Sequence, residues 1–183
     1  MSGNLDDKFL IASSIAGDEE AFGRIYDKYV DEIFRFILMR TRTKEEAQDL
    51  TSEAFLKTWQ YVSSADRHID NVRALLYRVG RNLVIDHYRK SGKEVHAFNE
   101  DEFEKLVDES IDLEEKVSKK DDIQKVFSLL HNLPEEAREI MLMRYAQDLS
   151  VSEIAKALGK KKGTVRVALH RAVKQLKAIL KHK

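Results

Sequence analysis

Residues 150–177 read SVSEIAKALGKKKGTVRVALHRAVKQLK, and this stretch decides the fold of the second half of the chain. Ser150 and Glu153 have the spacing of a capping box, in which the two residues satisfy each other's backbone amides. The pattern therefore predicts a short helix that begins at Ser150 and reaches Leu158. Gly159 follows directly, and glycine readily adopts the left-handed backbone conformation that a tight turn between helices requires.

A second helix follows this turn and is predicted to run from Gly163 or Thr164 to about Lys181. Two helices that cross closely need a small residue on the first, which Ala155 supplies. They also need a branched apolar residue on the second, which Val165 supplies. These spacings predict a helix-turn-helix, a motif that places its second helix in the major groove of DNA.

The outward face of the second helix and the turn before it are rich in lysine and arginine. The turn, from Lys160 to Lys162, is placed for DNA phosphates, and the N-terminal part of the helix is placed for base edges. The predicted DNA contacts are Lys161, Lys162, Thr164, Arg166, Val167, His170, Arg171 and Lys174. The alternative is a plain helical hairpin with a solvated, lysine-rich surface.

Charge is distributed in blocks along a chain of 183 residues whose formal net charge is zero. Residues 94–122 carry 12 acidic and 4 basic side chains, a net charge of −8. Residues 156–183 carry 10 basic side chains and no acidic one. The last block is attracted to phosphates and the acidic block is repelled by them. We interpret the acidic stretch, residues 93–120, as a linker between two domains.

Composition favours an all-α cytoplasmic protein. One proline and seven glycines are too few for a sheet protein with many turns. The absence of cysteine excludes disulfides and thiolate ligands, and the six histidines lack metal-ligand spacing. The sequence has no Gly-rich phosphate loop, no nucleophile motif and no apolar run of membrane length, and its N-terminus carries acids where a signal peptide has lysines. We therefore expect no enzyme activity, no metal or cofactor and no membrane contact.

Three helices are predicted in the first half of the chain. The first has Asp18 as its N-cap, and its apolar residues recur at a period near 3.6. The second opens with a capping box formed by Thr43 and Glu46. The predicted ranges are 18–42, 43–63 and 71–90, with a loop at 64–70.

The last of these three helices carries a polar line beside its apolar stripe. Arg78, Asn82, Asp86 and Arg89 are spaced four, four and three residues apart, which places them along one side of a helix. A carboxylate that faces phosphate is unfavourable. We therefore expect Asp86 to pair with Arg89 or Lys90, one turn on, and to orient that side chain.

Two parts of the chain resemble a known family. Residues 49–59, DLTSEAFLKTW, and residues 75–90, LLYRVGRNLVIDHYRK, resemble region two of sigma factors of the extracytoplasmic-function type, within the sigma-70 family. The segment from Leu133 onward, and above all residues 163–171, GTVRVALHR, resembles region four. The resemblance covers residues 18–92 and 121–180. Two independent matches around a linker make it more specific than a lone helix-turn-helix.

The resemblance implies an alternative sigma factor. Such a protein binds the β and β′ subunits of core RNA polymerase, recognises the −35 and −10 elements of a promoter and promotes DNA melting. The resemblance also implies two small helical domains joined by a flexible acidic linker, and an anti-sigma protein as a partner that covers both domains. The predicted divisions are residues 1–92 for the region-two domain, 93–120 for the linker and 121–183 for the region-four domain.

In the family, the helix that corresponds to residues 49–59 docks on a coiled coil of the polymerase. The residues that the resemblance places there are Asp49, Glu53, Phe55, Leu56 and Trp59. An exposed mixture of apolar and acidic side chains suits a protein partner. For Phe55 and for Trp59 the alternative is burial in the domain core.

The loop and helix that follow read the −10 element in the family, and the loop accepts a base flipped out of the opened duplex. The residues implied are Arg67, Asn71, Arg78, Arg81, Asn82, His87, Arg89 and Lys90. Tyr77 and Tyr88 either stack on bases or pack inside the domain. The alternative for the whole set is a solvated charged face.

The region-four match departs from the family's common pattern at Val167 and Ala168, where many members carry small polar and basic residues. The −35 sequence is therefore not predicted, and Arg166 and Arg171 are the leading candidates for specific contacts. Two rival functions stay open. One is a repressor or activator that binds DNA without polymerase, which leaves residues 49–90 without a role. The other is a helical adaptor that binds only protein.

Overall fold

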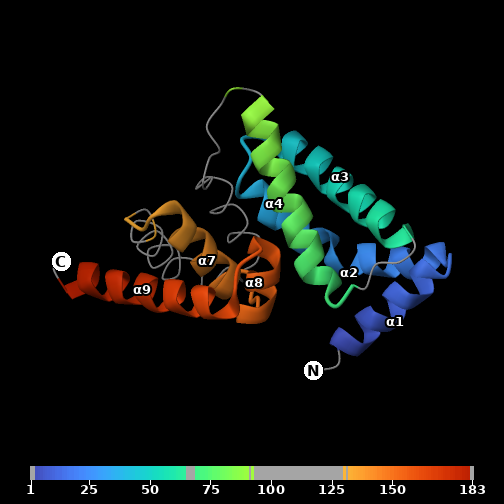
Figure 1. The fold of residues 1–183 in the computed structure, drawn as a ribbon. Helices are drawn as coiled ribbons and strands as arrows, with labels where there is room; N and C mark the ends of the chain where they lie inside the picture. Colours follow the sequence, from blue (N-terminus) through green and yellow to red (C-terminus); the bar gives the residue numbers. More distant parts are fainter. Residues whose placement is uncertain (1–2, 65–68, 91, 93–129, 131, 182–183) are drawn as a thin grey trace, which may run out of the picture. The chain divides into compact units, whose positions relative to one another are not determined.

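The computed structural model describes residues 3–64, 69–90, 92, 130 and 132–181, and these residues form helices and turns with no strand among them (Figure 1). The helices are α1 (Gly3–Ile15), α2 (Glu19–Leu38), α3 (Lys44–Ser63), α4 (Val72–Lys90), α7 (Glu135–Tyr145), α8 (Val151–Leu158) and α9 (Lys162–Lys181). They fall into two compact units, the first made of α1 to α4 and the second of α7, α9 and most of α8. The predicted linker and residues 65–68 of the predicted loop lie outside the described residues.

Helices α2, α3 and α4 form the body of the first unit, where each packs against the other two. Helix α1 packs across α2 and α3 (Figure 1). Phe36 of α2 meets Tyr77 of α4 edge to face, with ring centroids 4.6 Å apart. Burying an apolar side chain of this size stabilises a fold by about 1.5–3 kcal/mol. The largest fully buried side chains of this unit are Tyr77, Tyr88, Phe36, Ile25, Ile33, Ile37, Met39 and Leu76.

The three helices predicted in the first unit start where short polar side chains cap them. The Asp18 carboxylate accepts a hydrogen bond from the amide three residues on at 3.2 Å, and the Thr43 hydroxyl does the same at 3.1 Å. Asn71 caps α4 in the same way at 2.7 Å. These bonds satisfy amides that have no partner within the helix, and they fix each start to within one residue of the prediction.

Helix α2 ends earlier than the predicted boundary at residue 42. Its last regular residue is Leu38. The amides of Arg40 and Thr41 then bond to carbonyls three residues back instead of four, at 2.8 and 3.3 Å. The chain tightens here because Thr43 already has the extended backbone of the next N-cap.

Helix α1 was not predicted, because its buried side is partly polar. The buried residues are Asp7, Ile11 and Ser14, which follow helical spacing, while Phe9 is 70% exposed. An apolar period is therefore missing from the sequence, although a helical face is present. Asp7 accepts hydrogen bonds from the Tyr29 hydroxyl, at 2.6 Å, and from Lys28, so α2 satisfies its charge.

In the second unit, α7 packs against α9. Pro134 precedes α7 as its N-cap, where a missing amide proton leaves no hydrogen bond unmade. Arg138 on α7 donates through its guanidinium to the carbonyl of Leu130 at 3.1 Å and to that of Leu133 at 3.2 Å. The apolar cluster that joins these elements contains Leu130, Leu133, Met141, Leu142 and Ala172, with Ala137, Leu169, Val173 and Leu176 packed against it.

Candidate nucleic-acid interface

The helix-turn-helix predicted at the end of the chain is confirmed, and its turn has the expected hydrogen bonds. The Ser150 amide donates to the Glu153 carboxylate at 2.8 Å, and the Glu153 amide donates to the Ser150 hydroxyl at 3.2 Å. Gly159 has a φ of 64°, which lies in the left-handed region. The next amide, that of Lys160, donates to the carbonyl of Ala155 at 2.8 Å and closes the end of α8.

The two helices of the motif are anchored by the small and branched residues that the sequence indicated. Ala155 of α8 is 3% exposed, and Val165 of α9 is fully buried. Helix α9 begins at Lys162, slightly before the predicted start at Gly163 or Thr164. The Val165 amide already donates to the Lys161 carbonyl at 3.2 Å, so helical bonding begins at Lys161.

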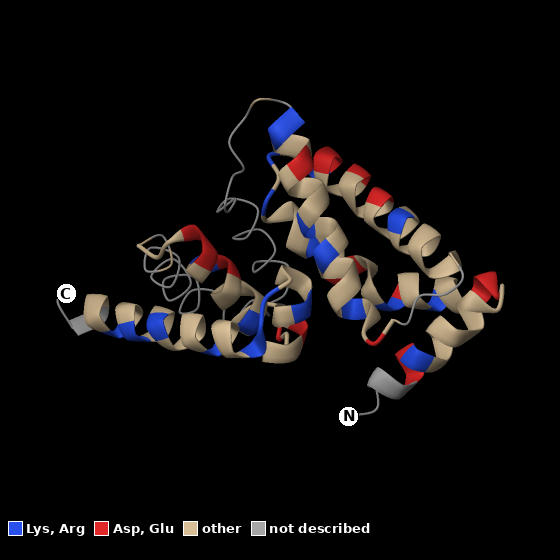
Figure 2. Ribbon diagram, viewed as in Figure 1, with Lys and Arg blue, Asp and Glu red and all other residues tan. Residues whose placement is uncertain are grey.

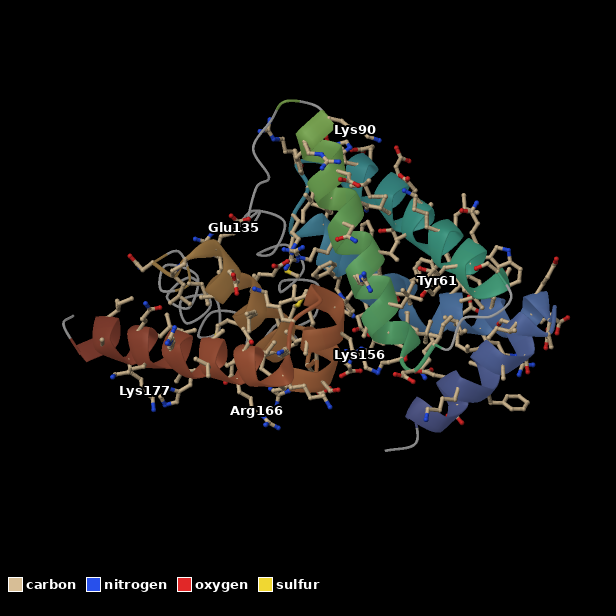
Figure 3. The ribbon with its side chains drawn as sticks, in the orientation of Figure 1. Tyr61, Lys90, Glu135, Lys156, Arg166 and Lys177 are labelled. Carbon is tan, nitrogen blue, oxygen red and sulfur yellow. The ribbon has the colours of Figure 1, made fainter. Side chains whose placement is uncertain are left out.

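The outward face of α9 is basic and open to solvent. Figure 2 shows lysine and arginine, and no acidic residue, along the described part of α9. Arg166 and Lys177 project from the side of α9 that is turned away from α7 (Figure 3). All the side chains predicted to contact DNA here are exposed: Lys161, Lys162, Thr164, Arg166, Val167, His170, Arg171 and Lys174.

One turn lysine differs from its neighbours. The Lys160 ammonium lies 2.7 Å from the Glu136 carboxylate of α7, and the Lys160 side chain is 33% exposed. Lys161 and Lys162, in contrast, are exposed. Lys160 therefore ties the turn to α7, and the charge that it offers to a phosphate is partly balanced within the protein.

Helix α4 brings several of the predicted −10 residues to one solvent-facing surface. Arg78, Asn82, Arg89 and Lys90 are exposed. The expected pairing of Asp86 is confirmed, because its carboxylate lies 2.9 Å from the Arg89 guanidinium. The other predicted residues have different positions: Asn71, Arg81 and His87 are half-buried, and Arg67 lies outside the described residues.

The end of α4 is held by Glu46, which lies in the first turn of α3. Its carboxylate accepts from the Arg42 amide at 3.0 Å and from the Tyr88 hydroxyl at 3.4 Å, and it lies 3.5 Å from His87. Burial alone raises the pKa of Glu46, but the Arg42 amide and His87 outweigh it, so this pKa lies below its usual value. Burial and the neighbouring Glu46 charge raise the pKa of Tyr88.

Both tyrosines that had two interpretations on α4 are packing residues in this structure. Tyr77 is fully buried and Tyr88 is 1% exposed. The Tyr77 hydroxyl donates to Glu32 of α2 at 2.7 Å. Burial and the Glu32 charge together raise the pKa of Tyr77 far above its usual value.

Glu32 of α2 and Arg73 of α4 set how α4 lies on α2, and neither residue was among those predicted from the sequence. The Arg73 guanidinium lies 2.6 Å from the Glu32 carboxylate, and both side chains are about one-fifth exposed, at 21% and 19%. A signal for Glu32 existed, since it stands three residues after Tyr29 and four before Phe36, on the apolar stripe of α2. A carboxylate at such a position requires a buried partner.

The predicted polymerase-binding residues on α3 divide into exposed and buried members. Asp49 is exposed, Leu56 is 55% exposed, and Glu53 is partly exposed and lies 2.9 Å from Lys57. Figure 2 shows acidic positions along this helix. Phe55 differs, because it is 3% exposed.

The burial of Phe55 favours the core alternative for this residue. Its ring packs against Tyr26 of α2, with centroids 4.8 Å apart. Trp59 is half-buried and packs against Phe22 of α2 at 4.9 Å. These ring contacts hold α3 against α2, and they thereby fix the position of the exposed residues on the other side of α3.

The described ranges hold neither a cluster of metal ligands nor a membrane-spanning helix. No three His, Asp or Glu side chains there come together as metal ligands would. None of the helices that the structure describes is both long enough and apolar enough to cross a bilayer.

Both units match known families. Residues 25–94 match the family described as Sigma-70 region 2, and this range includes most of α2 and all of α3 and α4. Residues 123–176 match the family described as Sigma-70, region 4, which includes the helix-turn-helix. The two matches occur in this order on one chain and together span more than half of it.

Solved structures share the fold. CnrH, solved in complex with the cytosolic domain of CnrY, superposes with a TM-score of 0.63 at 21% identity, over 97% of this chain and 99% of that chain. The sigma factor RpoE of Bartonella quintana, solved in complex with the anti-sigma factor NepR, gives 0.56 at 21% identity, over 87% and 96%.

Several curated proteins are similar in sequence. The chain is 32% identical over 176 residues to the ECF RNA polymerase sigma factor BldN of Streptomyces coelicolor, covering 93% of this chain and 64% of that protein. It is 28% identical over 156 residues to the ECF sigma factor SigM of Bacillus subtilis, covering 85% and 92%. It is 30% identical over 155 residues to the RNA polymerase sigma factor YlaC of the same organism, covering 84% and 88%. The chain therefore belongs to the sigma-70 family of RNA polymerase sigma factors, and within it to the extracytoplasmic-function type.

Proposed function

We propose that this protein is an alternative sigma factor, which binds core RNA polymerase, recognises −35 and −10 promoter elements and promotes melting of the DNA. The observation that carries the proposal is the joint presence of regions 2 and 4 on one chain. A repressor needs only the helix-turn-helix, and an adaptor that binds only protein has no need of an acid-free basic helix. The sigma function gives a role to both units.

The division of labour follows the two units. We assign residues 1–92 to polymerase and −10 binding, residues 93–120 to the linker and residues 121–183 to −35 binding. On α3, Asp49, Glu53 and Leu56 supply the surface for the coiled coil of the polymerase. A half-exposed leucine that follows two carboxylates by one and two helical turns suits a protein partner more than a nucleic acid, since carboxylates repel phosphates.

On α4, the exposed basic and amide side chains contact the −10 strands. Arg89 is oriented for this by Asp86, at 2.9 Å. On α9, the exposed cations contact the −35 duplex, with phosphates held near the turn and base edges read by the first half of the helix. In this proposal the polymerase supplies the catalytic step, and this chain is a binding subunit without a cofactor. Its place of action is the cytoplasm.

An anti-sigma protein is the further partner that we infer. The RpoE protein of Bartonella quintana was solved with the anti-sigma factor NepR. Affinity purification of this chain from its native host should recover a protein that competes with core polymerase. Recovery of core polymerase alone, under growth conditions where the chain is present but directs no transcription, would contradict this part of the proposal.

Transcription by sigma-free core polymerase tests the function directly. The full chain is added to the core enzyme with a genomic promoter library, and the 5′ ends of transcripts are sequenced. Specific starts that share upstream −35 and −10 motifs are expected. DNA binding without polymerase binding would instead favour the repressor, and the absence of both would favour the adaptor.

A matched pair of variants tests the polymerase surface. Leu56→Glu should abolish binding to core polymerase without unfolding the chain, because the side chain is 55% exposed. Phe9→Glu is the control, since Phe9 is an exposed apolar residue on α1, at 70%, outside the proposed surface. Equal loss of polymerase binding in both variants would overturn the assignment of Leu56.

A further inference from the structure

Val167 stands at the centre of the basic face of α9. It is 50% exposed, although it is a branched apolar residue in a helix whose other branched residue nearby, Val165, is fully buried. At 3.6 residues per turn, two positions along a helix correspond to a rotation of about 200°. Val167 therefore points almost directly away from the apolar cluster that holds α9 to α7.

The surroundings of Val167 leave its methyl groups uncovered. In a helix, a side chain leans toward the turn that precedes it, and the residue one turn before Val167 is Gly163. A Cβ placed on Gly163 would meet nothing within 4 Å. The exposed side chains of Thr164, Arg171 and Lys174 lie on the same side of the helix. The result is a small apolar spot with a cationic border.

We propose that Val167 determines specificity by contacting the 5-methyl group of a thymine in the −35 element. This inference rests on the proposed function, because it requires α9 to enter the major groove. Thymine is the base that presents a methyl group in that groove, and apolar side chains are its natural contacts. Scattered exposed valines need no explanation on a protein surface. Val167, however, lies in the middle of the face that the motif turns toward bases. A polar side chain at this position could form hydrogen bonds with base edges, and valine cannot.

Removal of a single methyl group from the DNA tests the contact. Binding sequences are first selected with holoenzyme formed from core polymerase and the full chain. Each thymine of the selected −35 duplex is then replaced by uracil, one at a time, and holoenzyme affinity is measured by competition. At one thymine, uracil should weaken wild-type binding by about fourfold, the value expected for one buried methyl group.

The matching change in the protein is Val167→Ala, and together with the uracil replacement it forms a double-mutant cycle. Alanine is a better helix former than valine, so α9 remains folded in this variant. The variant should bind the thymine and uracil duplexes equally, because the methyl group has lost its partner. Arg171→Ala is the control: it should weaken binding to both duplexes while the uracil effect persists.

The proposal is overturned if the uracil effect has the same size in wild type and Val167→Ala, or if no thymine shows an effect. Failure of the proposed function has a different outcome, since no polymerase-dependent −35 motif would then be selected at all. A selected −35 motif with no thymine on either strand would also overturn the assignment of Val167 while leaving the sigma function in place.

Discussion

Single polar side chains decide how the basic end of α4 is held. Glu46 lies in the capping turn of α3, yet it accepts hydrogen bonds from the Arg42 amide and the Tyr88 hydroxyl and lies 3.5 Å from His87. A capping-box glutamate ordinarily bonds to the N-cap amide. Here it bonds one residue earlier, and the oxygen that accepts from the Arg42 amide also accepts from the Tyr88 hydroxyl of α4, while the other oxygen lies near His87.

This arrangement predicts a pH-dependent contribution to stability. The folded pKa of Glu46 lies below its ordinary value of 4.5. The ionised carboxylate therefore stabilises the fold above that value, and the contribution is lost as the pH falls through the folded pKa. The difference in free energy of unfolding between wild type and Glu46→Gln should be largest near neutral pH and shrink in acid.

Urea unfolding at a series of pH values, followed by Trp59 fluorescence, measures this difference. Trp59 is the single tryptophan and lies on α3, so it reports the first unit. Glu45→Gln is the matched control, since Glu45 is an exposed residue of the same helical turn. An equal pH dependence in both variants would show that the contacts of Glu46 contribute nothing specific.

The turn lysines lead to a second prediction at this scale. Each phosphate contact contributes about 0.9 to the slope of log affinity against log salt concentration. Lys161→Ala should lower the slope for duplex binding by about this amount. Lys160→Ala should lower it less, because Glu136 lies 2.7 Å from Lys160 and already neutralises part of its charge. Equal slopes for the two variants would refute this ranking.

At the scale of elements, α2 carries a glycine that the fold does not need. Gly23 is in the interior of a 20-residue helix, and a Cβ there would meet nothing within 4 Å. Gly23→Ala should therefore raise the free energy of unfolding of the first unit by about 1 kcal/mol. Urea unfolding monitored by Trp59 measures the gain.

Gly80 of α4 is the matched comparison. A Cβ there would lie 3.3 Å from Ile37 Cδ1, and Ile37 is fully buried. Gly80→Ala gains the same helix propensity but crowds the contact between α4 and α2, so its stability should fall short of that of Gly23→Ala. A larger gain at Gly80 would mean that α2 and α4 pack less tightly than this geometry indicates.

For the whole molecule, the separation of charge controls how it meets DNA. Residues 94–122 have a net charge of −8, whereas residues 156–183 have ten bases and no acid. The acidic stretch lowers the attraction of the entire chain for phosphate. Neutral substitutions at Glu100, Asp101, Glu102 and Glu104 should raise the affinity for random-sequence duplex several-fold at low salt.

Fluorescence anisotropy with a labelled duplex at increasing salt checks this prediction. The gain should vanish at about 1 M salt, where the Debye length is about 3 Å and distant charges are screened. A gain that persists at high salt would indicate a direct contact of these residues, and an unchanged affinity at low salt would show that the acidic stretch exerts no field on the DNA-binding face.

Much of the fold and of the candidate site could be predicted from local sequence. The capping boxes, Gly159 and the spacing of Ala155 and Val165 act within a few residues, so the helix-turn-helix and its exposed cations follow from local rules. The Asp86–Arg89 pair is one turn long and was predicted for the same reason. Helix α1 was missed because its buried side includes Asp7 and Ser14.

Only the tertiary structure decided which side chains are buried between helices. Phe55 and Leu56 are neighbours of similar hydrophobicity, yet one is 3% exposed and the other 55%, because Tyr26 of α2 covers the first. Glu32 and Arg73 are 41 residues apart, and a pair of that separation has no local signature. The sequence by itself determined where the side-chain-capped helices α2, α3, α4 and α8 begin and which face of α9 is basic, since both depend on neighbours in the chain. The packing of α2 against α3 and α4 decided the rest, since burial depends on residues distant in sequence.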